Sequence, residues 1–120
     1  AHGWYPVGTN PAHPMNTLSR FKAGLARFRG FCDKAGRDPG EIAVALRVLS
    51  GPGVKPRGTI EGEGEMFTGN DADWVADIQA LAALGVAAVD VRLFGYGAAQ
   101  SLDGTIDNMR RFRDGVLSRL

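Results

Sequence analysis

Two arginines near the ends of predicted strands are the residues best suited to bind a ligand. Arg47 belongs to the apolar run 42–49, and Arg92 belongs to the run 86–94. A guanidinium group presents paired N–H donors in one plane, so either arginine can bind a cofactor phosphate or an acidic substrate with two hydrogen bonds. The structural alternative is an ion pair between one of them and Asp90 across neighbouring strands. The pattern therefore predicts an anion site or an ion pair here.

Trp4 and Tyr5 are the aromatic candidates for contact with a cofactor. They are adjacent in the first apolar segment, Gly3-Trp4-Tyr5-Pro6-Val7-Gly8. At a strand end, rings of this kind can stack on a flavin-like ring, whereas packing in the core or at an interface is the more common use. With Arg47 and Arg92 they complete the predicted cofactor-binding set.

Other chemistry has weaker support in this chain. His2 and His13 are the only histidines, and neither has a cysteine or carboxylate at metal-ligand spacing, so no metal site is predicted. His13 can be interpreted as a proton-transfer group or as a solvated loop residue. The segment Gly95-Tyr96-Gly97 could let the backbone approach a phosphate, but its glycine spacing is not that of a dinucleotide fingerprint. No serine or cysteine nucleophile with a paired base is present, and the catalytic residues stay unassigned.

Alternating strands and helices must position these groups. Apolar residues that recur every second residue predict strands, and apolar residues that recur every three to four residues predict helices. The expected strands cover residues 3–7, 42–49 and 86–94, and the expected helices cover residues 17–35, 71–84 and 102–118. Strands that alternate with helices favour a parallel sheet with right-handed crossovers, so the predicted fold class is α/β.

The two later strands share one pattern, with branched aliphatic residues on one face and small or polar residues on the other. The second face carries Ala43, Ala45, Arg47, Ala88, Asp90, Arg92 and Phe94. In an α/β barrel, the inner face leads to an active site at the carboxyl ends of the strands. Three strands cannot close a barrel, so apolar surface on this face needs cover. We therefore expect a homo-oligomer or a missing N-terminal half.

Composition indicates one ordinary globular domain over residues 1–120. Hydrophobic residues make up 44% and charged residues 22%, and the formal net charge of +1 gives no bulk field for nucleic acid or a membrane. The 17 glycines concentrate between Gly51 and Gly69, which predicts a long irregular loop over residues 50–69. The lone Cys32 excludes an intrachain disulfide, is expected in the core, and fits a reducing cytoplasm.

The order of several segments resembles the C-terminal portion of luciferase-like monooxygenases, and most closely the deazaflavin-dependent oxidoreductase branch. The resemblance extends over nearly all of the chain. The segments that carry it are Gly3-Trp4-Tyr5-Pro6-Val7-Gly8, Ala35-Gly36-Arg37-Asp38-Pro39, Met66-Phe67-Thr68-Gly69-Asn70, Leu84-Gly85-Val86 and Met109-Arg110-Arg111-Phe112.

This resemblance implies the C-terminal part of a TIM-barrel-like (β/α)₈ fold that uses FMN or a deazaflavin coenzyme for hydride transfer to or from a small molecule. Most of the family's cofactor contacts, including the glycine pair that receives the cofactor phosphate, precede the segment that begins at Gly3. We therefore expect the chain alone to bind flavin weakly or not at all and to be inactive. The alternative interpretation is a small non-catalytic α/β module that self-associates to cover its sheet.

Overall fold

Three short strands form one parallel sheet in the computed structural model, which describes residues 2–93 and 101–120. The strands are β1 (Gly3–Trp4), β2 (Ala43–Val48) and β5 (Ala88–Val91), and their order in the sheet is β1-β2-β5. Gly3 lies opposite Ala43, and Ala45 lies opposite Ala88. A parallel bridge from Val7 to Arg47 continues the first pairing beyond β1. The predicted α/β class and the parallel strand pairing are confirmed.

Three helices begin close to their predicted N-termini. They are α1 (Leu18–Lys34), α2 (Asp71–Ala83) and α3 (Leu102–Gly115), and the short 3₁₀ turns are η1 (Pro39–Glu41) and η2 (Leu117–Arg119). Each α-helix has a side-chain N-cap: Thr17, Asn70 and Ser101 accept hydrogen bonds from backbone N–H groups three residues later. α3 ends at Gly115 rather than at the predicted residue 118, because the chain tightens into η2.

The strands are shorter than expected. β1 covers two of the five predicted residues, and β5 ends at Val91 rather than at Phe94. Phe94 and Gly95-Tyr96-Gly97 lie outside the described residues. An edge strand has a partner on one side alone, so its ladder of hydrogen bonds is short even where the residue pattern continues.

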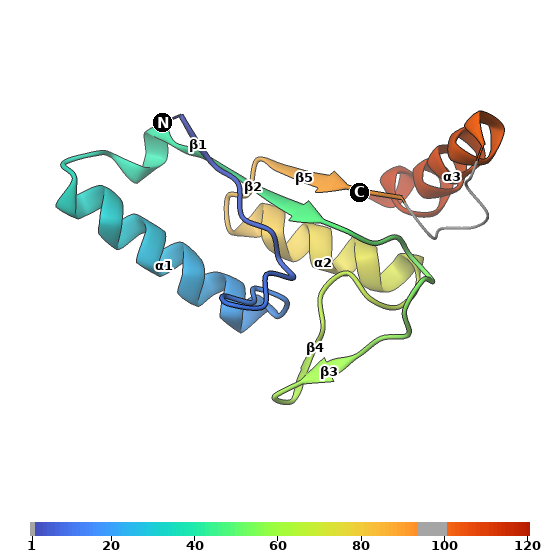
Figure 1. Ribbon diagram of the computed structural model, residues 1–120, viewed down its shortest axis with the longest axis horizontal. Helices are drawn as coiled ribbons and strands as arrows, with labels where there is room; N and C mark the ends of the chain where they lie inside the picture. Colours follow the sequence, from blue (N-terminus) through green and yellow to red (C-terminus); the bar gives the residue numbers. More distant parts are fainter. Residues whose placement is uncertain (1, 94–100) are drawn as a thin grey trace.

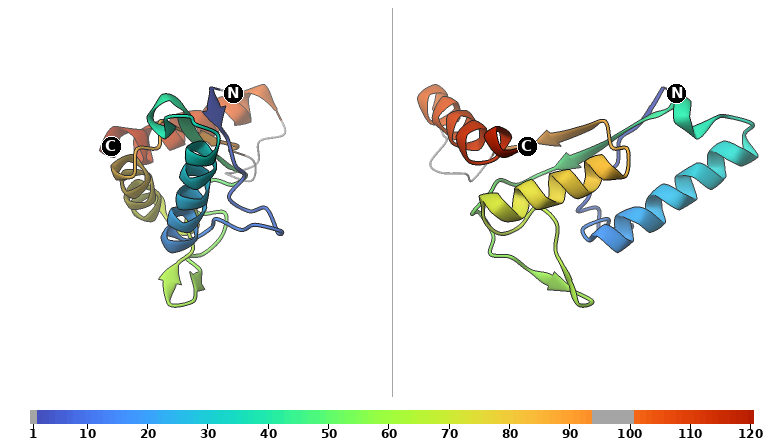
Figure 2. Two further views of the ribbon diagram at one scale, coloured as in Figure 1. Left: turned by 90° about the vertical axis from the view of Figure 1, so that its left-hand side faces the viewer. Right: turned by 180° about the vertical axis from the view of Figure 1, so that it is seen from behind.

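α1 and α2 cover the same face of the sheet (Figure 1), and the two further views in Figure 2 agree. This follows from the strand order, because successive crossovers of one hand along a sheet without reversal place their helices on one side. The apolar residues of β2 point to these helices, as predicted, and pack with the core residues Phe21, Leu25, Trp74 and Leu81. Cys32 is buried in α1, as expected. The opposite face of the sheet has no helix over it among the described residues.

The glycine-rich segment contains a small hairpin that sequence analysis did not predict. Strands β3 (Thr59–Ile60) and β4 (Glu63–Gly64) pair antiparallel. Glu61 and Gly62 join them with φ values of 54° and 81°, which is the backbone of a type I′ turn. Asn-Gly is the strong signal for this turn, and a Glu-Gly pair surrounded by further glycines does not stand out. The prediction of an irregular loop is corrected in this respect.

An ion pair holds the base of the hairpin against α2. The guanidinium of Arg57 donates to both carboxylate oxygens of Asp77, at 2.7 and 3.0 Å, and to the carbonyl of Thr68 at 3.2 Å. Asp77 is buried and also accepts the N–H of Phe67 at 2.8 Å. Two charge-assisted bonds in one plane restrict the position of the segment more than a single contact does. Residues 65–68 therefore have a defined place beside the end of β2.

Among the described residues, none of the helices has both the length and the apolar character that crossing a membrane requires.

Candidate functional site

Three polar side chains, one from each strand or the residues that follow it, lie together on the uncovered face of the sheet. The hydroxyl of Tyr5, which follows β1, donates a hydrogen bond to the carboxylate of Asp90 in β5. The Nε atom of Arg47 in β2 lies 3.8 Å from the same carboxylate. The structure thus brings Tyr5 and Arg47 of the predicted set together, and the contact of Arg47 with Asp90 is the ion pair that sequence analysis gave as the structural alternative to ligand binding. We call these three residues the open-face cluster.

The small residues of this face make the cluster possible. Tyr5 and Asp90 stand on the two outer strands, so the phenol ring must cross the middle strand to reach the carboxylate. Arg47 lies opposite Asp90, and Ala45 lies opposite Ala88. Continuing the pairing of Gly3 with Ala43 places Tyr5 beside Ala45, so the ring runs diagonally over Ala45 toward Asp90. Neighbouring strands are about 4.8 Å apart, so only a short side chain between them leaves room for the ring. The alanines that sequence analysis assigned to this face therefore have a steric role.

The electrostatics of the cluster favour hydrogen-bond donation. The hydrogen bond to Asp90 raises the pKa of the Tyr5 phenol, with smaller contributions from desolvation and from the negative charge of Asp90. Tyr5 therefore stays protonated at neutral pH and acts as a donor rather than a base. The Nε atom of Arg47 is buried and makes no hydrogen bond with the described residues. The Arg47 side chain as a whole is 39% exposed, so an anionic or carbonyl oxygen of a ligand can approach the guanidinium group, but not through the buried Nε atom.

We predict that Asp90→Asn lowers the pKa of Tyr5 toward its ordinary value, because the anionic acceptor is lost. Absorbance titration in a Tyr96→Phe background reports this phenol alone. Since the folded pKa lies above the unfolded value, the hydrogen bond stabilises the fold below the unfolded pKa, and this contribution disappears as pH rises through the folded pKa. Asp38→Asn, at an exposed turn, is the control. An unchanged titration midpoint in Asp90→Asn would contradict the assignment.

A cavity of about 120 Å³ lies at the carboxyl end of the middle strand. The residues after β1, the end of β2 and residues 65–68 line it, and Arg47 connects it to the open-face cluster. Lys55 and Glu65 form an ion pair at its edge, with the ammonium 2.8 and 3.0 Å from the two carboxylate oxygens. The side chain of Glu65 is 16% exposed, whereas that of Lys55 is 58% exposed. The cavity therefore contains a positive, a negative and several hydroxyl or backbone groups.

Sequence analysis missed Lys55 and Glu65. Both stand in the glycine-rich segment, and nothing in their spacing of ten residues indicates a contact. The contact depends on the hairpin, which returns the chain so that the N–H of Glu65 donates to the carbonyl of Gly58 at 2.8 Å. Recognition of the turn at Glu61-Gly62 is the one signal that could have found the pair.

The structure places Trp4 away from this cluster. Its ring faces α1 and stacks on Phe28, with centroids 4.8 Å apart and planes at 4°, and at 6.5 Å on Phe21. This is the core-aromatic alternative of the sequence analysis. Arg92 is exposed just beyond β5, and its backbone N–H donates to the carbonyl of Val48 at 2.9 Å. His13 is exposed in the connection between β1 and α1.

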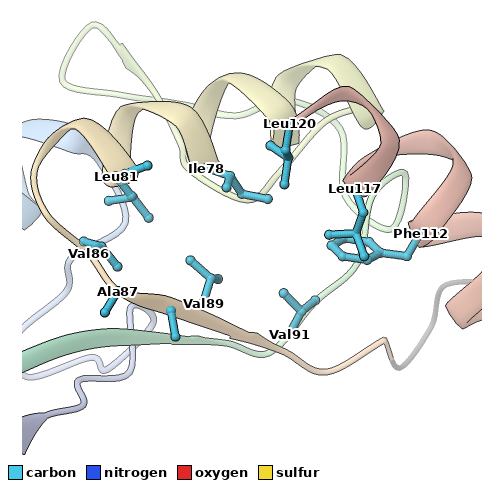
Figure 3. Close-up of a pocket in the computed structure, with 11 residues that line it drawn as sticks. Ile78, Leu81, Val86, Ala87, Val89, Val91, Phe112, Leu117 and Leu120 are labelled. Atoms are coloured by element: carbon cyan, nitrogen blue, oxygen red, sulfur yellow. The ribbon is translucent and has the colours of Figure 1, made fainter.

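A second hollow, of about 280 Å³, lies between β5, α2 and the C-terminal turn (Figure 3). Its lining consists entirely of apolar side chains, including Ile78, Leu81, Val89 and Phe112. A surface without hydrogen-bond donors, acceptors or titratable groups can pack against apolar groups but cannot catalyse a reaction. The hollow in Figure 3 is therefore no candidate active site.

The described residues contain no group of three or more histidine, cysteine, aspartate or glutamate side chains that could hold a metal ion.

In comparisons with known proteins, no family model matches this sequence, and no curated protein or solved structure matches it either.

Proposed function

We propose that this chain is the C-terminal segment of a luciferase-like, flavin- or deazaflavin-dependent oxidoreductase barrel. In this proposal the chain supplies three of the parallel strands and the anion-binding part of the site. The observation that carries the proposal is the open-face cluster, which holds a partly exposed arginine beside a cavity at the carboxyl ends of parallel strands. Ligands of α/β barrels bind at that end. The choice of this family rests on the resemblance of several sequence segments, in the same order along the chain, to luciferase-like monooxygenases.

The strand arrangement supports the barrel part of this proposal. Parallel strands in chain order with α1 and α2 on one face have the layering expected of a barrel wall. A doubly wound sheet reverses its strand order at one point, where its helices change faces, and the order β1-β2-β5 contains no such point. Two free sheet edges, at β1 and β5, would take the remaining strands of a closed barrel.

The residues present fit one part of the implied cofactor. The phenol of Tyr5 lies over the middle strand and offers a planar ring on which a flavin-like ring could stack, and the partly exposed guanidinium of Arg47 is a donor for a phosphate or a ring carbonyl oxygen. When bound, the cofactor supplies hydride transfer. Tyr5 would orient the arginine through their shared carboxylate, and Lys55 would add positive charge at the cavity.

We predict that, in the complete or assembled barrel, Arg47→Ala weakens the binding of FMN or the deazaflavin coenzyme by about tenfold or more. A charge-assisted hydrogen bond contributes roughly 1.5–3 kcal/mol, and 1.4 kcal/mol corresponds to a factor of ten. Fluorescence titration measures the change, with Arg29→Ala on the outer side of α1 as the control. Arg92→Ala is expected to act in the same direction. If Arg47→Ala unfolds the protein without a selective loss of ligand affinity, the ion-pair interpretation is correct instead.

The second candidate is a non-catalytic module that self-associates. It is favoured by the all-apolar hollow in Figure 3, whose lining residues Leu117 and Leu120 are about half exposed. Apolar surface of this kind is usually covered by a partner. The two candidates differ in one measurable property, because a purely structural module has no reason to prefer a phosphate-bearing ligand.

A further inference from the structure

A basic groove runs along α1 on the edge of the molecule. Its volume is about 600 Å³, and it lies between α1 and the segment that leads from β1 to the helix. Gly24 lets α1 pack closely against Met15 at the wall of the groove, because a Cβ atom there would come within 2.7 Å of the sulfur of Met15. We call it the α1 groove and define it by Trp4, Met15, Arg20, Arg27, Phe28 and Phe31.

The positive charge of α1 favours the binding of a negatively charged segment in the groove. Residues 18–37 hold six cationic side chains and one carboxylate, a net charge of +5, whereas the remaining residues hold eight cationic and twelve anionic side chains, a net charge of −4. Arg20 is partly satisfied by Glu61 and Asn16. The side chain of Arg27 makes no hydrogen bond or ion pair with the residues that the structure describes. The groove therefore suits an apolar segment with acidic flanks.

The first half of α3 has that composition. Leu102, Ile106 and Met109 are spaced by four and three residues and form one stripe, and Leu102 and Met109 are 76% and 58% exposed. Asp103 and Asp107 flank the stripe, and Asp107 also forms an exposed ion pair with Arg110, the first cationic residue of this helix, at 3.3 Å. An exposed apolar stripe beside two carboxylates is complementary to an aromatic groove beside two arginines.

The α1 groove and α3 of one chain lie far apart. α1 and α3 occupy opposite ends of the long axis in Figures 1 and 2, and α3 extends beyond the sheet at the end to which β5 points. The longest extent of the molecule is 48 Å. A helix in that place cannot reach the groove of its own chain, so the complementary helix must come from another molecule.

We propose that α3 of a second copy of this chain binds in the α1 groove, with Leu102 and Met109 against the aromatic side chains and the aspartates beside Arg27. In this mode of binding, an amphipathic helix lies in a groove and contacts it through side chains spaced by four and three residues. The contact is heterologous, because the surface that donates differs from the surface that accepts. A pair of copies therefore keeps one free groove and one free α3, and further association produces a ring or a chain of copies. Neither surface includes the open-face cluster.

Sedimentation velocity over a concentration series tests the proposal with two charge reversals. Arg27→Glu disables the groove, and Asp107→Arg disables the helix, so each variant alone is expected to lose self-association by about tenfold or more. An equimolar mixture of the two is expected to associate again, since the intact groove meets the intact α3 and the two reversed charges also attract each other. Arg29→Glu and Asp114→Arg are the matched controls on the same helices.

Three results would overturn the proposal. A wild-type chain that remains monomeric at high micromolar concentration shows that no second copy binds, whatever else the groove attracts. Association that both reversals leave unchanged shows that a different surface is used. Two variants that are folded by circular dichroism, monomeric alone and still monomeric when mixed show that the contact does not join a groove to a helix. Because these readouts involve no cofactor, they stand independently of the proposed enzymatic role.

Discussion

Replacement of Trp74 by alanine is expected to destabilise the fold by about 4 kcal/mol, the middle of the range for removing a buried aromatic side chain. Trp74 is completely buried near the start of α2. Its ring meets Phe67 of the glycine-rich segment at 5.0 Å and Phe112 of α3 at 6.1 Å, both edge to face. One side chain thus joins three segments at the carboxyl end of the sheet. Urea denaturation followed by circular dichroism measures the loss.

The matched control is Trp74→Phe. Phenylalanine keeps an aromatic ring in the same place and removes the indole N–H, which has no hydrogen-bond partner among the described residues. Loss of an unsatisfied buried donor offsets part of the lost packing. We therefore expect Trp74→Phe to cost less than half as much as Trp74→Ala. Equal losses in both variants would show that Trp74 does not join these segments through its ring.

Arg57→Ala is expected to cost about 3 kcal/mol, at the low end of the range for breaking a buried ion pair. The low end applies because the Arg57 side chain is partly exposed, whereas Asp77 is 8% exposed. The hydrogen bond to Asp77 raises the pKa of Arg57, so the arginine stays charged. Its removal leaves a buried carboxylate with the single N–H of Phe67. Thermal and urea denaturation both report the change.

Lys55→Ala is the control for this prediction. It breaks another ion pair of the same segment, but the lysine is mostly exposed, and exposed pairs contribute about 1 kcal/mol or less. Comparable losses in the two variants would contradict the view that the pair of Arg57 and Asp77 fixes the segment. A large loss in Arg57→Ala together with weaker ligand binding would show that the segment also shapes the cavity.

Helix positions could be predicted because local signals agree with each other. The N-cap Asn70 and its reciprocal partner Asp73 form a capping box. The acidic residues that follow Asn70 in the sequence predict this helix start. Gly36 ends α1 with a φ of 67°, a conformation that glycine adopts without strain. In β2, apolar residues alternate with small or polar ones, and this pattern correctly predicts that Leu46 is buried whereas Arg47 is partly exposed.

The contacts of the site are harder to predict because they join residues far apart in the chain. Tyr5 and Asp90 are 85 residues apart, and their hydrogen bond depends on the register of three strands and on a small residue at Ala45. The side to which Trp4 points follows from that same register. Adjacent aromatic residues on a strand face opposite ways, so Trp4 and Tyr5 could not belong to one site on the sheet.

Chemical-shift mapping with FMN and riboflavin tests the central claim, that the uncovered sheet face is an anion-binding part of a flavin or deazaflavin site. At millimolar ligand, we predict that FMN shifts the amide signals of Tyr5, Arg47 and Asp90, that riboflavin shifts them less, and that Arg47→Ala abolishes the difference. The difference isolates the phosphate, because the two ligands share one ring system. FMN shifts confined to the α1 groove, or equal shifts with both ligands at the open-face cluster, would contradict the claim.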